Sequence, residues 1–502
     1  MASVVGITAI ALLAQHVQAV NNGLARTPQM GWDNWNSFGC DVSEDLLQGT
    51  ARLIVDYGLK DLGYEYVVLD DCWSNGRDAS ANNSLIVDTE KFPRGMAAVA
   101  DDIHELGLKF GMYSSAGVYT CGRFAGSLGY EEVDANSWAE WGVDYLKYDN
   151  CYNSGEAGTQ KLSHDRYNTM AKALNATGRP ILYSLCNWGE DYPWNWGPTI
   201  ANSWRITGDV TDFYDRPDPR CPCDGPDAWD CSLPGFHCSL LNIINKASFV
   251  VSKAEPGGWN DLDMLEVGNG GMSDAEYKTQ FSVWAAVKSP LIMGNDLRIV
   301  KPQDLAILSN AAVIAVNQDP LGSSAARRWY YETDDVDQYG KGSIQMWAGS
   351  LNSTTGGEYS DMVVLLINGN NSNMTMNATL VEVFADSGGA ISDQAKIAWE
   401  VRDLWANRMS NEEAQAIIDA SSASGNYTSG FNATRVGGEN RYNATAKSYS
   451  EGLSDADELL LGNVTTTVQP MGTITAEVER HGIAMFRLRA VPTGSLRKRT
   501  EL

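Results

Sequence analysis

The sequence predicts an α/β protein in which a (β/α)8 TIM barrel is followed by a C-terminal antiparallel β-sandwich domain. Between about residues 30 and 297, short apolar runs alternate with segments of helical spacing. This alternation is typical of parallel strands joined by crossover helices. After about residue 323, short β-rich runs separated by turn residues replace the helical pattern, which is typical of a small sandwich.

Six strand-like runs carry the barrel prediction. They lie at residues 64–71 (YEYVVLDD), 108–115 (LKFGMYSS), 143–150 (VDYLKYDN), 179–186 (RPILYSLC), 203–209 (SWRITGD) and 289–297 (SPLIMGNDL). Ahead of the second run, Val99, Ile103 and Leu106 recur at helical spacing, and Gly107 is a typical helix end. Strand–helix units repeated over a stretch of this length favour an eight-fold barrel.

Polar side chains at the ends of these runs favour a barrel over a doubly wound sheet. They occur at Asp70-Asp71, Asp149-Asn150, Cys186-Asn187, Gly208-Asp209 and Asp263. In a barrel, the C-terminal strand ends gather on one face, where the active site lies. A doubly wound sheet concentrates such groups at a switch point, and no G-x-G-x-x-G fingerprint follows the first run.

The chain is predicted to divide into three parts: a signal peptide at residues 1–19, the catalytic barrel at 20–322 and the sandwich at 323–502. The apolar run VVGITAIALLA followed by Val17-Gln18-Ala19 is typical of a secretory signal, although a buried first strand is the alternative. No later segment is apolar for long enough to span a bilayer, so a secreted protein without a membrane partner is expected.

Ten N-x-[ST] sequons and nine cysteines also favour secretion. Seven sequons lie between Asn370 and Asn463, and three of these fall in a polar stretch near residues 409–452 that we interpret as a glycosylated surface insertion. Because nine is odd, at least one thiol is free or pairs between chains.

Charge and histidine content exclude other classes. Thirty-seven basic and 63 acidic residues give a formal net charge of −26, which disfavours nucleic acid as a partner. Only five histidines are present, so neither a metal nor another cofactor is predicted. Cys221, Cys223, Cys231 and Cys238 have spacing that a zinc site can use, but a loop closed by two disulfides suits a secreted chain better.

Six motifs occur in the order in which one enzyme family carries them. They are GWDNWNSFGC (31–40), VVLDDCW (67–73), DYLKYDNC (144–151), SLCNWGED (184–191), SWRITGD (203–209) and GGWNDLDML (257–265). Together they resemble secreted fungal α-galactosidases (melibiases) of glycoside hydrolase family 27. The resemblance covers residues 26 to about 320 and, more loosely, the sandwich.

The resemblance implies a retaining double displacement with two carboxylates. Asp149 in YLKYDNC matches the family's nucleophile, and Asp209 in SWRITGD matches its acid/base. Lys147 lies two residues before Asp149, on the same face of a strand, and is expected to keep Asp149 ionised by lowering its pKa. Burial or the second carboxylate is expected to hold a proton on Asp209, and Arg205 is expected to contact the sugar.

The remaining family positions imply a galactose pocket. Asp70 and Asp71 match the pair that binds the 4- and 6-hydroxyls, which requires a strand end or a bulge because adjacent strand residues face opposite ways. Asp263 matches a contact to the 2-hydroxyl, and Trp188 fills the space beside it. The other substrate-binding positions are Trp35, under the sugar, and Tyr113, Cys121, Lys147, Cys186, Asn187, Gly189, Arg205 and Met264.

The family pattern further implies the disulfides Cys40–Cys72 and Cys121–Cys151. Some relatives pair the cysteine at position 186 with one just before the SWR segment, where this chain has Ile200-Ala201-Asn202. Cys186 is therefore expected to be the free thiol. The four cysteines at 221–238 are expected to pair with one another, as Cys221–Cys238 and Cys223–Cys231 in one arrangement.

The function predicted is exo-acting hydrolysis of terminal α-D-galactose from oligosaccharides or galactomannan. The alternatives are an α-N-acetylgalactosaminidase, against which the bulk of Trp188 argues, and a β-L-arabinopyranosidase, whose pentose lacks the 6-hydroxyl assigned to Asp71. An inactive carbohydrate-binding protein is a third alternative, which the presence of Asp149 and Asp209 disfavours. Melibiose, raffinose-type sugars and galactomannan all remain open as substrates, and the oligomeric state is not indicated.

Overall fold

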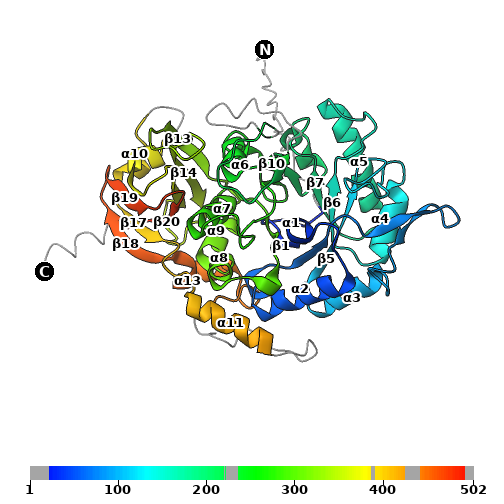
Figure 1. The fold of residues 1–502 in the computed structure, drawn as a ribbon. Coiled ribbons are helices and arrows are strands. Elements are labelled where there is room, and N and C mark those ends of the chain that lie inside the picture. Colours follow the sequence, from blue (N-terminus) through cyan, green and yellow to red (C-terminus); the bar gives the residue numbers. More distant parts are fainter. Residues whose placement is uncertain (1–21, 220, 222–235, 386–389, 424–440, 492–502) are drawn as a thin grey trace, which may run out of the picture.

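The computed structural model describes residues 22–219, 221, 236–385, 390–423 and 441–491. Eight parallel strands form one curled sheet in the order β11-β8-β7-β6-β5-β2-β1-β12. A parallel bridge between Leu265, which follows β11, and Met293 in β12 joins the two ends of this order. The sheet is therefore a barrel, and the predicted fold class is confirmed (Figure 1).

The barrel strands are short. They are β1 (Met30–Asp33), β2 (Tyr66–Leu69), β5 (Lys109–Ser115), β6 (Tyr145–Asp149), β7 (Leu182–Cys186), β8 (Ser203–Arg205), β11 (Trp259–Asp261) and β12 (Leu291–Met293). Six of them lie within the predicted runs. Strands β1 (MGWD) and β11 (WND) were not predicted, because neither contains a run of apolar residues.

Helices surround the barrel (Figure 1). They are α2 (Glu44–Asp56), α3 (Met96–Glu105), α4 (Glu131–Glu140), α5 (Gln160–Ala176), α6 (Leu240–Ala247), α7 (Asp274–Ala286), α8 (Pro302–Leu308) and α9 (Ala311–Asn317). Hydroxyl side chains start four of them: Ser43, Thr159, Ser239 and Ser273 each accept the backbone N–H three residues on. Gly107, at φ +68°, follows α3 as predicted.

Short elements follow the C-terminal strand ends and carry part of the functional face. Helix α1 (Trp35–Phe38) follows β1, the hairpin β3 (Ser74–Asp78) and β4 (Ser84–Val87) follows β2, and β9 (Asp209–Val210) pairs with β10 (Phe236–Cys238). Trp35 and Asp209 thus lie just outside the barrel strands rather than within them. Their positions depend on loops that only the closed barrel brings together.

The second domain is antiparallel. Its six-stranded sheet runs in the order β13 (Ala326–Glu332), β14 (Ser343–Leu351), β15 (Asp361–Asn368), β20 (Ile483–Ala490), β17 (Trp399–Asp403), β18 (Asn463–Val468). A second pair, β16 (Met374–Thr379) with β19 (Thr473–Val478), packs over it, and α10 (Leu380–Val383) follows β16. Val364, Leu366, Met376, Ile474 and Leu488 belong to the shared core.

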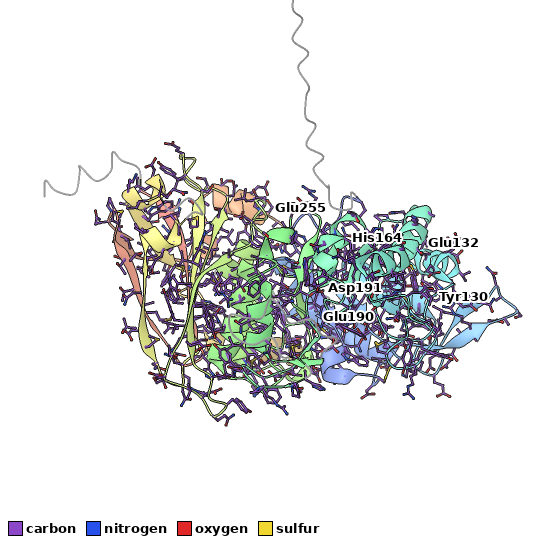
Figure 2. All side chains as sticks on the ribbon, turned by 90° about the horizontal axis from the view of Figure 1, so that it is seen from above. Tyr130, Glu132, His164, Glu190, Asp191 and Glu255 are labelled. Atoms are coloured by element: carbon purple, nitrogen blue, oxygen red, sulfur yellow. A yellow bond between two sulfur atoms is a disulfide. The ribbon has the colours of Figure 1, made fainter. Side chains whose placement is uncertain are left out.

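The two domains lie side by side and touch through α7 (Figures 1 and 2). Helix α7 packs on β15 and β20, and its Ser282 hydroxyl accepts the indole N–H of Trp405 at 3.0 Å. Helix α9 ends at Asn317 and β13 begins at Ala326, so the predicted boundary after residue 322 falls between them.

The flanks of the predicted insertion differ from the expectation of a free surface segment. Helix α11 (Asn411–Ala423) packs against α8 and α2, and the N–H of Ala444 donates to the carbonyl of Asp61 at 2.6 Å. The Tyr449 hydroxyl, in α12 (Tyr449–Ser454), donates to the carbonyl of Leu62 at 3.0 Å. These contacts are made by backbone groups and one aromatic ring, so the polar composition of the segment does not indicate them. α13 (Glu458–Leu461) completes this region.

Two further expectations can be compared with the structure. Asn370, the acceptor of one sequon, is only 5% exposed and accepts a hydrogen bond from Thr333, so this sequon does not lie on the surface. The predicted signal peptide (residues 1–19) and residues 424–440, with two more sequons, lie outside the described residues. Among the described helices, none is both long and apolar enough to cross a bilayer.

Candidate active site

A pocket opens at the C-terminal ends of the barrel strands. It brings together Trp35, Asn36, Asp70, Tyr113, Cys121, Lys147, Asp149, Cys186, Trp188, Arg205, Asp209, Asp263 and Met264. Every predicted site residue is in this set except Asp71, Asn187 and Gly189. Asn36 is an addition that the sequence analysis missed, although it follows Trp35 directly in the GWDNWN motif.

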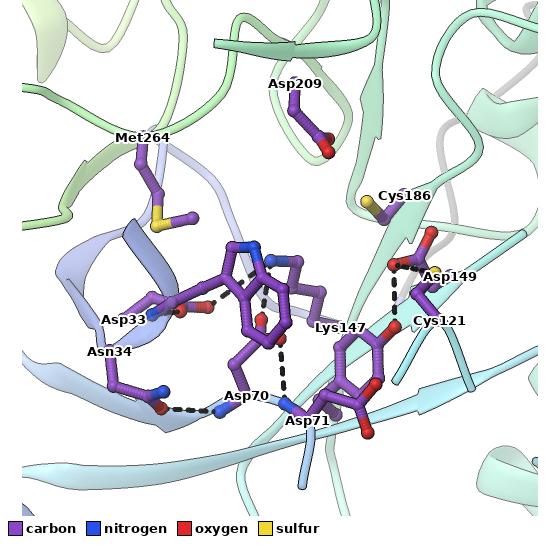
Figure 3. Close-up of polar contacts among 12 residues, drawn as sticks. Asp33, Asn34, Asp70, Asp71, Cys121, Lys147, Asp149, Cys186, Asp209 and Met264 are labelled. Carbon is purple, nitrogen blue, oxygen red and sulfur yellow. Dashed lines mark hydrogen bonds and ion pairs between the residues drawn. The ribbon is translucent and has the colours of Figure 1, made fainter. Parts of the chain in front are cut away.

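Asp149 is the last residue of β6 and is buried, with 6% of its surface exposed. The Tyr113 hydroxyl donates to its Oδ2 at 2.8 Å (Figure 3). The N–H of Asn150 donates to its Oδ1 at 2.8 Å. The Tyr167 hydroxyl donates to its carbonyl oxygen at 3.1 Å. Both the carboxylate and the backbone of Asp149 are therefore held in one orientation.

The pKa of Asp149 is raised to about 7 by burial, and the charge of Asp209 adds to this effect. Lys147 and the hydrogen bonds from Asn150 and Tyr113 lower it, but burial outweighs them. Lys147 therefore lowers the pKa of Asp149 as predicted, but its effect is smaller than that of burial. The Lys147 ammonium pairs with Asp70 at 2.6 Å rather than with Asp149.

Asp209 lies on the opposite side of Cys186 from Asp149 in the close-up view (Figure 3). Its side chain is 49% exposed and lies 3.1 Å from the Arg205 guanidinium. Of the two causes expected to act on Asp209, burial or the second carboxylate, burial is the weaker, since Asp149 is the buried member of the pair. Arg205 also pairs with Asp263 at 2.8 Å, and Asp263 accepts the N–H of Val210 at 2.8 Å, so these contacts tie the Asp209 segment to β8 and to the loop after β11.

Asp33 is a second residue that the sequence analysis missed. It ends β1, its Oδ2 lies 3.7 Å from the Lys147 ammonium, and its Oδ1 accepts the N–H of Trp35 at 2.9 Å. Burial raises the pKa of Asp33 to about 8 against the opposing effect of Lys147, and the neighbouring Asp70 raises it further. Recognising β1 as a strand would have placed Asp33 among the strand-end acids.

Asp70 and Asp71 both follow β2, which ends at Leu69, as the prediction of a strand end requires. Their carboxylates point to different partners. Asp70 faces the pocket and binds Lys147, whereas Asp71 accepts the N–H groups of Gly122 at 2.7 Å and Cys72 at 2.7 Å. Asp71 is 1% exposed, and it does not line the pocket in this structure.

The loop after β7 presents Trp188 to the pocket and keeps its neighbours outside. Trp188 and Gly189 both have positive φ, at +59° and +81°. A side chain at Gly189 would meet the carbonyl oxygen of Ile206 at 2.2 Å, so only glycine fits there. The Asn187 amide donates to the carbonyl of Glu190 at 2.8 Å, which closes the loop rather than lining the site.

The described cysteines pair as the resemblance implied. Disulfides join Cys40 to Cys72, Cys121 to Cys151, and Cys221 to Cys238, the last having been one of several pairings left open. Among the described residues Cys186 is the one free cysteine. It is buried, and burial raises its pKa well above the usual range of a thiol. Cys223 and Cys231 lie outside the described residues.

Side chains that could bind a metal come close together at one place in the described part of the chain. One group of three lies close enough together, formed by Cys121, Asp149 and Cys151. The two cysteines form a disulfide, so neither offers a thiolate to a metal. The Sγ of Cys121 lies 3.3 Å from Oδ2 of Asp149 and, for the same reason, has no proton to donate.

Comparison with known proteins agrees with this geometry. The family described as Alpha galactosidase A matches residues 27–319, and the Alpha galactosidase C-terminal beta sandwich domain matches residues 341–424. The α-galactosidase of Lachancea cidri is 55% identical over 469 residues, which cover 93% of this chain and 95% of the relative.

Solved structures give the same picture. An α-galactosidase from Saccharomyces cerevisiae superposes with a TM-score of 0.87 at 50% identity, covering 94% of this chain and all of the other, and it has also been solved with raffinose. Alpha-galactosidase I from Mortierella vinacea gives a TM-score of 0.75 at 44% identity over 93% of this chain and 98% of the other. A β-L-arabinopyranosidase from Geobacillus stearothermophilus, at 21% identity, shares the fold alone.

Proposed function

This chain belongs to the α-galactosidase family of glycoside hydrolases, and on that premise we propose that it removes terminal, non-reducing α-D-galactose by a retaining double displacement. One observation carries the proposal: a buried, rigidly held carboxylate, Asp149, and a half-exposed carboxylate, Asp209, line the same pocket. Two carboxylates in such different surroundings suit two different roles.

In the first step Asp149 attacks the anomeric carbon of the bound galactoside. The bond from that carbon to the glycosidic oxygen breaks, and Asp209 gives its proton to the departing oxygen. The product is a β-galactosyl ester of Asp149 and a free alcohol. In the second step Asp209 takes a proton from water, and the oxygen of this water attacks the same carbon. The ester bond to Asp149 breaks, which releases α-galactose and returns Asp149 to its ionised form.

The charge state of the pair supports this division of roles. The charge of Asp209 contributes to the raised pKa of Asp149, so a proton on Asp209 removes that repulsion and favours ionised Asp149. The reactive form then has one proton on the exposed acid and none on the buried nucleophile. Exposure of Asp209 suits a group that has to meet both the leaving oxygen and the incoming water.

Polar contacts in the pocket support galactose as the sugar. Asp70, held by Lys147, is proposed to accept the 4-hydroxyl, and Asp263, held by Arg205, to accept the 2-hydroxyl. Trp35 and Met264 supply apolar surface to the same pocket. The assignment of Asp71 to the 6-hydroxyl rests on the family resemblance alone, because its carboxylate is bound to backbone N–H groups.

The proposed substrates are oligosaccharides that end in α-galactose, with raffinose-type sugars and galactomannan side chains as candidates. The pocket lies above the packed interior of the barrel. Action on chain ends is proposed on the family resemblance. We also propose that the protein is secreted, since three disulfides among the described residues suit an oxidising compartment.

The stereochemistry of the first product tests the mechanism. Proton NMR during hydrolysis of p-nitrophenyl α-galactoside is expected to show α-galactose first and β-galactose only after mutarotation. Initial release of β-galactose would mean a single displacement by water, and Asp149 would then be a general base rather than the nucleophile.

A further inference from the structure

The segment that follows Asp209 leads to the boundary between the two domains. The backbone continues from β9 through Asp212 to Tyr214, which is 4% exposed. The carbonyl oxygens of Phe213 and Tyr214 accept the N–H groups of Leu240 and Leu241, at 2.9 and 3.0 Å, at the start of α6. Asp209 is therefore five residues from a buried, anchored aromatic ring.

That ring packs against a residue of the second domain. The imidazole of His481 stacks on Tyr214 with ring centroids 4.2 Å apart and an interplanar angle of 11°. His481 lies in the turn between β19 and β20, is 4% exposed and has φ +55°. A stacked pair with both members this buried cannot slide without opening the contact between the domains.

His481 is itself held by α7. Its Nδ1 lies 2.6 Å from Oε1 of Glu276, and because a carboxylate only accepts, the ring donates this hydrogen bond. The Thr279 hydroxyl donates to the carbonyl oxygen of His481 at 2.9 Å. Glu276 also closes the capping box that begins α7, so the turn of the second domain is bound to a fixed helix end.

The same helix supports the Asp209 side of the pocket directly. The Tyr277 hydroxyl lies 3.0 Å from both oxygens of Asp212, and the Trp284 indole donates to the carbonyl of Asp263 at 2.8 Å. Helix α7 thus contacts three parts of the protein: the segment after Asp209, the loop that carries Asp263, and the second domain. The stacked rings of Tyr214 and His481 add a direct contact between the segment after Asp209 and the second domain.

We propose that the second domain takes part in catalysis by positioning Asp209, and that His481 and Tyr214 are the positioning residues. The proposal rests on the proposed role of Asp209 as acid/base. The Asp209 side chain is half exposed and touches Arg205, so its placement depends on the backbone that carries it. Holding that backbone at Tyr214 keeps the carboxyl within reach of the glycosidic oxygen.

The choice of leaving group distinguishes a specific loss of acid catalysis from a general loss of activity. His481→Asn keeps a side-chain amide for Glu276 and tolerates positive φ, but it loses the stacked ring. Tyr214→Leu loses the stack from the other side. Tyr214→Phe is the matched control, since the Tyr214 hydroxyl has no hydrogen-bond partner in the described part of the chain. Each full-length variant is assayed for kcat/KM on melibiose and on 2,4-dinitrophenyl α-galactoside.

Melibiose has a sugar alcohol as leaving group and needs a proton, whereas dinitrophenolate leaves without one. A well-placed general acid contributes about 10²- to 10⁴-fold, so we expect both stacking variants to lose about tenfold on melibiose. On the dinitrophenyl substrate they should stay within about twofold of the unmodified enzyme, as should Tyr214→Phe on both substrates. Equal losses on the two substrates, or no loss on either, would overturn the proposal.

Asp209→Asn distinguishes this outcome from failure of the underlying assignment. If Asp209 is the acid, Asp209→Asn shows a much larger loss on melibiose than on the dinitrophenyl substrate. If it instead hydrolyses melibiose normally, the proposed role of Asp209 is wrong regardless of His481. Circular dichroism and thermal unfolding of each variant identify any that fail to fold, and the second stacking variant then decides the result.

Discussion

The hydroxyl of Tyr113 donates a 2.8 Å hydrogen bond to Oδ2 of Asp149, across neighbouring strands of the barrel. This bond stabilises the ionised carboxylate and lowers the pKa of Asp149, while burial and the charge of Asp209 raise it to about 7. The charge of Asp209 is absent when Asp209 carries its proton. The ionisation that governs the reactive form of the enzyme is therefore expected below pH 7.

Tyr113→Phe is expected to shift the acidic limb of the kcat/KM profile upward. Loss of the hydrogen bond disfavours the ionised form, so Asp149 ionises at a higher pH, by about 0.5–1 unit. The lost charged hydrogen bond should also lower the plateau about tenfold. The measurement is kcat/KM for p-nitrophenyl α-galactoside from pH 3 to 8.

Tyr167→Phe is the matched control for this shift. The Tyr167 hydroxyl donates to the carbonyl oxygen of Asp149 and not to its carboxylate, so its removal should leave the acidic limb in place. An equal shift in both variants, or no shift in Tyr113→Phe, would show that the Tyr113 bond does not govern this ionisation.

Asp149→Ala is expected to abolish turnover while leaving the fold intact. The loss should be about 10³-fold or more, because the covalent step has no substitute nucleophile. Azide added to the variant with an activated aryl galactoside should enter the vacated space and form the inverted β-galactosyl azide, which NMR identifies. Full hydrolysis by Asp149→Ala, or formation of the α-azide, would contradict the assignment.

Thiol titration tests the cysteine pairing. After denaturation without reductant, about one thiol per chain is expected, and peptide mapping should place it at Cys186. In the native enzyme the reaction should be slow, because Cys186 is buried and its pKa is raised well above the usual range, so little thiolate is present. Cys186→Ala should show no thiol, and a thiol found at Cys223 or Cys231 would refute the pairing predicted for that loop.

Sugar specificity tests the pocket wall. Trp188 lines the pocket, and the family resemblance implies that it fills the space that an N-acetyl group at C2 would need. The enzyme is therefore expected to hydrolyse p-nitrophenyl α-galactoside well and the α-N-acetylgalactosaminide hardly at all. The α-glucoside should also be poor, because its equatorial 4-hydroxyl misses Asp70 and a charged hydrogen bond to the substrate is lost.

Trp188→Gly should raise the ratio of N-acetylgalactosaminide to galactoside kcat/KM by about tenfold or more. Glycine is chosen because position 188 has φ +59°, which glycine adopts without strain since it has no Cβ. Comparable rates of the unmodified enzyme on both substrates would refute the role given to Trp188, and comparable rates on the glucoside would refute that given to Asp70.

Asp33→Asn is expected to flatten the dependence of stability on pH. Burial raises the pKa of Asp33 to about 8, whereas in the unfolded chain an aspartate titrates near about 4. The folded state then binds more protons, so the free energy of unfolding falls as pH rises between these values. The asparagine variant lacks this titration and should lose less Tm between pH 4.5 and 7.5 than the unmodified enzyme.

The control for Asp33→Asn is Glu332→Gln, which removes an exposed carboxylate at the end of β13 and should leave the pH dependence unchanged. A parallel fall of Tm in the unmodified enzyme and in Asp33→Asn would show that Asp33 does not hold its proton in the folded chain.

Much of the site was predictable because its residues lie in short, ordered motifs at strand ends. Asp149 and Asp209 sit in YLKYDNC and SWRITGD, and the structure places both in the pocket. Asp33 and Asn36 escaped notice because the stretch MGWDNWN (30–36) contains no apolar run that would indicate a strand end there. Asp71, Asn187 and Gly189 lie in the motifs that predicted the site, yet in the structure they do not line the pocket.

The sequence by itself predicted the fold class, the two carboxylates and, among the described residues, the free thiol at Cys186, because these depend on residue order and on local motifs. Only the tertiary structure decided which charges meet. Lys147 precedes Asp149 by two residues but pairs with Asp70, and the acid that proves buried is Asp149 rather than Asp209. Burial and ion pairing depend on distances between strands far apart in the chain, which no local pattern encodes.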